Sequence, residues 1–315
     1  MQLIEYDSLC KVQVRGFKQD CFFLEQIMKL ILFLTLTLLA TEVFASAIST
    51  SSTEVRYDSR NRPVIATHVN EQGPYYMVVD TGAEVTLIKP ELAKLLKLNS
   101  FDTGLTINGS TGAITAKAFA VDKFTSELFD VSYVGLLSLP NQGSTEAAGI
   151  IGMDLFADKA LVFDSSGHTM RVVPSGKVEG DYTIVPAIKD GGLLLHVNVM
   201  MNGVNIPALI DTGAAGTIAN ASALKALGWK ETDPHLVSDG SILGATRDLR
   251  QVKKATVETI SLGEITMRDV PVRFTTVIDD EPPSIILGTD VLNSLIGFAI
   301  DFPRREFLIQ LPKKS

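Results

Sequence analysis

One stretch of sequence occurs twice and decides the fold: Val78-Val79-Asp80-Thr81-Gly82-Ala83, and later Leu209-Ile210-Asp211-Thr212-Gly213-Ala214. A His-Val-Asn tripeptide precedes each copy, at 68–70 and at 196–198. In each copy an apolar run ends in a carboxylate, and the following Thr-Gly lets a buried strand turn sharply. Self-similarity of this kind predicts a chain built from two halves with the same fold.

The repeat extends beyond these motifs. A short helix is expected after each of them, over 90–96 and 221–227, and Gly228 fits the end of the second helix. Each half closes with two apolar residues and a glycine, at 150–152 and 286–288. Short strands with turns account for the rest, including 115–121, 255–262 and 270–275. We therefore expect a mostly β protein with lobes at 55–174 and 183–312, joined by a polar linker at 175–182.

The N-terminal sequence has the pattern of an export signal that follows an extension. Met28-Lys29 precedes the apolar run 30–40, and Ala45-Ser46-Ala47 follows it. That run is shorter than the ~20 residues that a membrane-spanning helix needs, and the three parts together are typical of a secretory signal peptide. We expect translation to start at Met28, residues 1–27 to be an upstream extension, and 28–47 to be removed; a long native n-region is the alternative. The predicted location is periplasmic or secreted.

Composition excludes several classes of partner. The chain has 315 residues, of which 46% are hydrophobic, and its formal net charge is −8. An acidic chain without basic runs argues against nucleic acid as a partner, because phosphate backbones reward clustered Lys and Arg. The two cysteines, Cys10 and Cys21, both lie before the predicted cleavage point, so no thiolate site remains in the mature chain. With four His and no HExxH motif, we expect neither a metal nor another cofactor.

The repeated carboxylates predict a particular chemistry. A carboxylate at the end of a buried strand is costly unless it is used there. Two equivalent halves related by a pseudo-twofold would bring Asp80 and Asp211 together near the axis. Two adjacent carboxyls share one proton, so that the ionised one can accept a proton from water while the other polarises a carbonyl. This arrangement performs hydrolysis without a metal or a covalent intermediate.

These motifs resemble those of the retropepsin-like and pepsin-like aspartic proteases, and the chain looks like two retropepsin domains in tandem. The resemblance covers nearly all of 55–312 and implies an aspartic endopeptidase that acts on polypeptides, with its active site between two β-barrel lobes. It implies that Asp80 and Asp211 are catalytic. It also implies that Thr81 and Thr212 lock the two loops together and that Gly82 and Gly213 admit close backbone approach. Gly152 and Gly288 match the family's glycine behind the catalytic loop.

Three features differ from the patterns of the family and bear on substrate binding, on the titration of the dyad or on the branch of the family. Ala83 and Ala214 stand where pepsin-like enzymes carry Ser or Thr, and Glu84 stands opposite Ala215. Ala83, Glu84 and Ala214 are the candidate substrate-binding residues, and Glu84 would contribute on one side only. The missing hydroxyls predict a dyad that titrates higher than that of a pepsin. The candidate flaps, 107–114 and 241–247, contain no aromatic residue, which favours the retropepsin branch.

Other readings stay open from the residues alone. Asp102-Thr103-Gly104 lacks an apolar run and a partner in the other half, so we interpret it as a turn. Asp154 and Asp290 are expected to cap short helices. We expect a monomer that forms its own pseudo-dimer; a homodimer with two sites is a variant. The rival from another class is a non-catalytic protein that uses the cleft to hold peptides.

Overall fold

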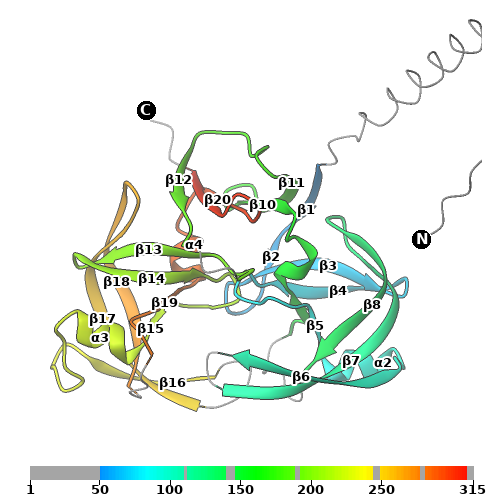
Figure 1. Ribbon diagram of the computed structural model, residues 1–315, viewed down its shortest axis with the longest axis horizontal. Coiled ribbons are helices and arrows are strands. Elements are labelled where there is room, and N and C mark those ends of the chain that lie inside the picture. Colours follow the sequence, from blue (N-terminus) through cyan, green and yellow to red (C-terminus); the bar gives the residue numbers. More distant parts are fainter. Residues whose placement is uncertain are drawn as a thin grey trace, which may run out of the picture. The chain divides into compact units, whose positions relative to one another are not determined.

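The computed structural model describes residues 50–109, 112–139, 146–188, 192–243, 249–276 and 281–310 (Figure 1). The expected extension and signal peptide therefore lie outside the described residues, as does the centre of the turn expected at 109–112. The fold is mostly β, as predicted, with three sheets. None of the helices within the described ranges is long and apolar enough to cross a membrane.

The N-terminal half forms an eight-stranded sheet that folds back on itself. Its order is β2-β3-β4-β9-β5-β8-β7-β6, and an additional pairing joins β3 to β7. The strands are β2 (Arg56–Tyr57), β3 (Pro63–Val69), β4 (Gln72–Val79), β5 (Leu87–Ile88), β6 (Ser100–Gly109), β7 (Gly112–Thr125), β8 (Asp130–Ser138) and β9 (Gly149–Ile151). Alternation explains β3, where every second residue from Pro63 to Val69 is buried.

The C-terminal half repeats this arrangement with seven strands. Its order is β13-β14-β19-β15-β18-β17-β16, and β13 also pairs with β17. The strands are β13 (His196–Met201), β14 (Val204–Ile210), β15 (Ile218–Ala219), β16 (Val237–Leu243), β17 (Leu249–Leu262), β18 (Ile265–Thr275) and β19 (Ile285–Leu287). In both halves the strand before the Asp-Thr-Gly motif runs parallel to the closing apolar strand: β4 beside β9, and β14 beside β19.

A third sheet takes strands from both halves, so the halves share backbone hydrogen bonds. Its order is β1-β11-β10-β20-β21-β12. The strands are β1 (Ser51–Glu54), β10 (Lys159–Asp164), β11 (Thr169–Pro174), β12 (Tyr182–Pro186), β20 (Gly297–Asp301) and β21 (Glu306–Gln310). The join between halves is the antiparallel pairing of β10 with β20, in which Phe163 lies opposite Phe298.

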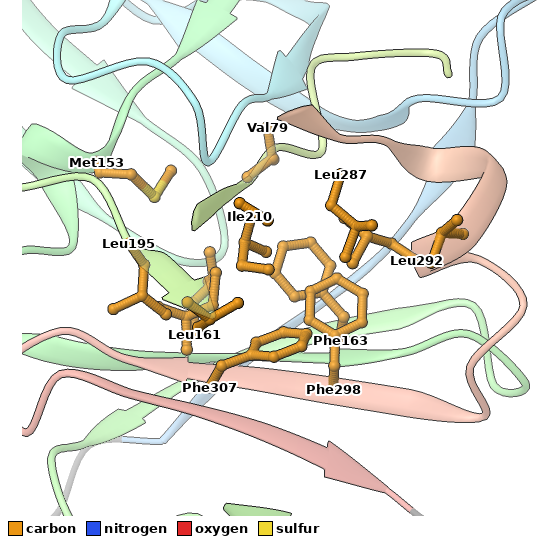
Figure 2. Close-up of a cluster of buried hydrophobic side chains, with 14 of the residues drawn as sticks. Val79, Met153, Leu161, Phe163, Leu195, Ile210, Leu287, Leu292, Phe298 and Phe307 are labelled. Carbon is orange, nitrogen blue, oxygen red and sulfur yellow. The ribbon is translucent and has the colours of Figure 1, made fainter. Parts of the chain in front are cut away.

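The buried core lies directly behind the two repeated motifs. Figure 2 shows Val79 and Ile210, the residues that precede Asp80 and Asp211, in the same cluster as aromatic side chains of the shared sheet. Phe163 and Phe298 stack with ring centroids 4.4 Å apart. Burial of each such side chain contributes roughly 1.5–3 kcal/mol, so this cluster fixes both motifs to one framework.

Two short helices follow the motifs, close to where they were expected. They are α2 (Pro90–Leu95) and α3 (Ala221–Ala226). Pro90 supplies the first helical position of α2, and Asn220 caps α3 by accepting a hydrogen bond from the Ala223 N–H (2.8 Å). A 3₁₀ turn, η1 (Met153–Leu155), and a helix, α4 (Thr289–Leu292), follow the closing glycines.

Two expectations about aspartates are wrong. Asp154 and Asp290 do not cap η1 and α4, whose N-cap residues are Gly152 and Gly288. Their carboxylates instead accept hydrogen bonds from Thr86 and Thr217, in the loops that follow Asp80 and Asp211. Asp102-Thr103-Gly104 is not a connecting turn: it lies inside β6 at a register irregularity, which Gly104 accommodates with a φ of 66°.

Candidate functional site

The structure brings the carboxyls of Asp80 and Asp211 together. Both residues follow the end of a buried strand, and their N–H groups donate to Ile151 and Leu287 at 3.0 and 3.1 Å. A side chain at Gly82 would collide with the other half's aspartate, because its Cβ would lie 2.5 Å from Asp211 Cγ. A Cβ at Gly213 would overlap the Asp80 carboxyl in the same way. The motif therefore needs glycine at both positions for the aspartates to meet.

The two threonines lock the loops through four hydrogen bonds. Thr81 N–H donates to Thr212 Oγ1 at 3.1 Å, and Thr212 N–H donates to Thr81 Oγ1 at 3.0 Å. Each hydroxyl then donates across to the other half, Thr81 to Ile210 O at 2.7 Å and Thr212 to Val79 O at 2.6 Å. Both threonines are 1% exposed, so these bonds are closed to water. The network sets the separation of the two loops.

The two carboxyls have unequal hydrogen-bond partners. Asp80 Oδ1 accepts one backbone bond, from Gly82 N–H at 2.9 Å. Asp211 Oδ1 accepts two, from Gly213 at 2.7 Å and Ala214 at 3.0 Å. The equivalent N–H of Ala83 donates instead to the main-chain oxygen of Asp80 at 3.2 Å. Because N–H donors stabilise the ionised form, Asp211 is the better anion and Asp80 is the partner that keeps the proton.

The pKa of the Asp80 carboxyl is raised well above its usual range. Loss of hydration is the main cause, followed by the charge of Asp211 and the hydrogen bond between the two carboxyls. The pKa of Asp211 is raised too, by loss of hydration, and its hydrogen bonds from Asp80, Gly213 and Ala214 work against that rise. A pair coupled in this way holds one shared proton over a range of pH and titrates as a unit.

This shared proton predicts a pH-dependent stability difference. Between the usual Asp pKa and the raised pKa of Asp80, the folded chain keeps a proton that the unfolded chain has released. The resulting stabilisation is complete at low pH and is lost as the pH rises through the raised pKa. The side chain introduced in Asp80→Asn cannot ionise. The melting temperature of this variant minus that of the wild type should therefore increase as the pH rises. Thermal melts of both from about pH 3 to pH 8 test this. A difference that does not change with pH would contradict it.

A buried ion pair lies beside the dyad. Arg62 is paired with Asp58 at 2.6 Å, with side chains 11% and 3% exposed, and its Nη1 lies 3.5 Å from Gly213 O. Burial raises the pKa of Asp58, but hydrogen bonds from Arg62 and from the Arg60 backbone bring it below its usual value. The Arg62 charge also works against the raised pKa values of Asp80 and Asp211. Arg62 therefore belongs to the electrostatics of the site.

Removal of this charge should move the pH profile of any activity of the dyad. In Arg62→Gln the Asp58 carboxylate would be left buried and unpaired, so the change is best made together with Asp58→Asn. Without the cation both macroscopic pKa values of the dyad rise, and the bell-shaped profile of kcat/KM shifts to higher pH. Arg62→Lys keeps the charge and is the matched control. A profile that stays in place in the double variant would show that Arg62 does not act on the dyad.

A second pair of threonines holds each loop from behind. Thr86 Oγ1 donates to Asp154 Oδ1 at 2.7 Å, and Thr217 Oγ1 donates to Asp290 Oδ1 at 2.8 Å. Gly152 and Gly288 N–H donate to the same two hydroxyls at 3.1 and 3.2 Å. Burial raises the pKa of Asp154, and its hydrogen bonds with Thr86 work against that rise. The closing glycine of each half is thus tied to its catalytic-motif loop.

The closing glycines must lack side chains. A Cβ at Gly288 would lie 2.6 Å from the Gly216 backbone, and a Cβ at Gly152 would overlap the backbone of Val85. The chain therefore passes directly behind each loop, as the sequence resemblance implied. A family model described as "Aspartyl protease" matches the two halves separately, at 65–155 and 197–291, which is more than half of the chain. The chain belongs to the aspartyl protease family.

Other comparisons add little to this assignment. No curated protein matches the chain. Among solved structures it is similar to the crystal structure of a retropepsin-like aspartic protease from Rickettsia conorii, at 19% identity. That match covers 41% of this chain and 89% of the other, with a TM-score of 0.30. The tandem retropepsin-like organisation thus rests on the family model and on the sheets described above.

The predicted substrate-binding residues lie in the two loops that follow Asp80 and Asp211. Glu84 and Ala215 are exposed, and Ala83 and Ala214 are partly buried. Ala83 O and Ala214 O accept hydrogen bonds from Met153 and Thr289 at 2.9 and 2.8 Å, so these loops are held firmly. The predicted difference between halves is present: a carboxylate stands at this position in one loop and a methyl group in the other. The role of Glu84 in binding stays a prediction.

The candidate flaps correspond to hairpins in both halves. Residues 107–114 span the β6–β7 connection, where Gly109 pairs with Gly112. Residues 241–247 begin in β16, which pairs with β17 up to Leu243 and Leu249. The tips themselves, 110–111 and 244–248, lie outside the described residues. Among the residues that are described, no group of three or more His, Cys, Asp or Glu could hold a metal ion.

Proposed function

We propose that the chain is an aspartic endopeptidase that hydrolyses peptide bonds with a water activated between Asp80 and Asp211. The observation that carries the proposal is that matching residues of the two halves bring the two carboxyls together, each against the motif glycine of the other half. Membership of the aspartyl protease family supports a polypeptide substrate. The two halves of one chain supply both aspartates, which supports a monomer with an internal pseudo-dimer.

The unequal hydrogen bonding assigns a role to each carboxyl. Asp211, with two backbone donors, is the ionised partner and takes a proton from the water. Asp80 carries the shared proton and gives it to the substrate carbonyl oxygen as the water oxygen bonds to the carbonyl carbon. The C–N bond then breaks as its nitrogen receives a proton from Asp211, and a hydroxyl of the tetrahedral intermediate returns its proton to Asp80, which restores the dyad and leaves a carboxylic acid and an amine. No covalent bond to the protein forms at any step.

Export is part of the proposal. The signal-peptide pattern at 28–47 supports a periplasmic or secreted enzyme whose mature chain begins at Ile48. N-terminal sequencing of the exported protein tests both the start and the cleavage point. A mature chain that began upstream of Met28 would contradict the assignment of 1–27 as an extension.

The proposed activity is tested by incubating the mature chain with an unfolded protein mixture from about pH 3 to pH 8, a range that brackets a shared-proton dyad. Cleavage should extend to mildly acidic or neutral pH, because no hydroxyl side chain at Ala83 or Ala214 stabilises the ionised dyad. An Asp80→Asn, Asp211→Asn double variant should be inactive throughout. An optimum as acidic as that of a gastric pepsin would refute the predicted pH range. A folded wild-type chain that cleaves nothing would favour the peptide-binding alternative.

A further inference from the structure

The strand register shows that the two halves differ just beyond the catalytic loops. β15 pairs Ile218 with Arg273, and the equivalent β5 pairs Leu87 with Leu137. Arg273 of the C-terminal half therefore occupies the position of Leu137 in the N-terminal half. A threonine precedes each of these short strands, Thr86 before β5 and Thr217 before β15. The residue before that threonine is Val85 in the N-terminal half and Gly216 in the C-terminal half. An apolar pair in one half is thus a glycine and an arginine in the other.

A third position completes the difference. In the C-terminal half, Arg273 lies opposite Lys254, which in turn pairs with Val237 in β16. In the N-terminal half, Leu137 lies opposite Ala118, which in turn pairs with Phe101 in β6. Two residues beyond Val237 and Phe101 come Asp239 and Thr103. Arg273 Nε donates to Asp239 Oδ2 at 2.6 Å. Thr103 Oγ1 instead donates to Ala116 O of the neighbouring strand β7, at 3.0 Å.

The Arg273 guanidinium fills the space that a side chain at 216 would take. A Cβ at Gly216 would lie 2.5 Å from Arg273 Nη1 and 3.5 Å from Asp290 Oδ2. Gly216 ends the loop that carries Asp211, and Asp239 lies on β16, the strand that leads to the candidate flap. The guanidinium therefore lies between the end of the loop that carries Asp211 and the strand that leads to the candidate flap.

The terminal nitrogens of Arg273 are available there. Its side chain is 37% exposed, and Nε is the atom that Asp239 holds. Among the described residues, no hydrogen bond from Nη1 or Nη2 is seen. Asp290 accepts from Thr217 N–H at 2.9 Å and from its hydroxyl at 2.8 Å, so its carboxylate is already satisfied. Because the Asp239 carboxylate balances the charge of the Arg273 guanidinium, the site offers fixed hydrogen-bond donors rather than a net positive charge.

We infer that Arg273 forms a substrate subsite on the C-terminal side of the cleft that selects a side-chain oxygen acceptor, an amide or a carboxylate. The equivalent N-terminal position, built from Val85, Leu137 and Thr103, accepts an apolar side chain instead. This inference rests on the proposed function, because it places a peptide between the loops and the flaps. It makes the cleft directional although its two halves share a fold.

The test measures peptide binding rather than cleavage. Extended peptides carrying Gln, Glu or Met at one position at a time are titrated into the Asp80→Asn variant, which keeps the cleft but not the chemistry. At one position Gln and Glu should bind about 10-fold tighter than Met, the size expected for a hydrogen bond to a charged, partly exposed donor. Glu and Gln separate a carboxylate preference from an amide preference.

Two further substitutions in that background locate the effect. Arg273→Met should abolish the preference at that position and leave the others unchanged, whereas a structural defect would weaken all peptides alike. Gly216→Ala should weaken the preference, because its Cβ displaces only the end of the Arg273 side chain, and Val85 shows that this loop position accepts a side chain. No discrimination at any position, or discrimination that persists in Arg273→Met, overturns the inference. If the wild type cleaves nothing while Asp80→Asn still discriminates, only the proposed catalysis fails.

Discussion

Asp80→Asn is expected to lower kcat/KM by about 10²–10⁴-fold or more, because it removes the acid that protonates the substrate carbonyl and the partner that shares the proton of Asp211. Asp211→Asn should cost a similar factor by removing the base. The two residues act as a unit, so the double variant should be no worse than either single variant. Cleavage rates of an unfolded protein mixture at the optimum pH of the wild type provide the measurement.

The chain contains its own control for this experiment. Asp102 belongs to a third Asp-Thr-Gly, and its side chain is exposed within β6. Asp102→Asn should leave the cleavage rate unchanged. Substantial activity in Asp80→Asn or Asp211→Asn, or its loss in Asp102→Asn, would show that the dyad has been misplaced.

Thr81→Val is expected to destabilise the fold strongly. It removes the acceptor of Thr212 N–H and the donor to Ile210 O, and both groups are then buried without a partner. Each unsatisfied group costs about 1–3 kcal/mol, so the free energy of unfolding should fall by about 2–6 kcal/mol. Denaturant unfolding of the variant beside the wild type measures this loss. Thr212→Val should behave alike, because the network is reciprocal.

Serine variants separate the hydroxyl from the methyl group of these threonines. Thr81→Ser and Thr212→Ser keep all four hydrogen bonds and should retain most of the stability and the position of the loops. A Thr81→Val variant as stable as Thr81→Ser would contradict the role of the network. If Thr81→Val were as stable as Thr81→Ser but no longer cleaved the substrate, the network would serve only to position the dyad.

The fold and the approach of the two aspartates could be predicted from the sequence because both follow from repeated, local patterns. An apolar run, Asp-Thr-Gly and a later apolar-apolar-Gly specify the same loop twice, and symmetry then brings Asp80 and Asp211 together. Thr86 and Thr217 occupy matched places six residues after the two aspartates, so the same comparison could have found them. Asp154 and Asp290 were misjudged because a helix start favours an N-cap, whereas tertiary contact directs both carboxylates to these threonines.

Arg62 and Arg273 could not be foreseen, because each acts through partners fixed only by the fold. Arg62 reaches the dyad because β3 lies beside β4, and its contact with Gly213 joins residues far apart in sequence. Arg273 reaches Gly216 through the pairing of β18 with β15. The N-terminal half has Leu137 at the position of Arg273, so the repeat offers no signal for that arginine.

The central claim is that one chain builds one site from its own two halves, and mixing inactive variants tests it most directly. Purified Asp80→Asn and Asp211→Asn chains are combined, unfolded and refolded together, and assayed for cleavage beside each variant alone. A site within one chain predicts that the mixture stays as inactive as its components, because every chain lacks one carboxylate. Activity restored in the mixture would show that aspartates from different chains pair, and would contradict the account.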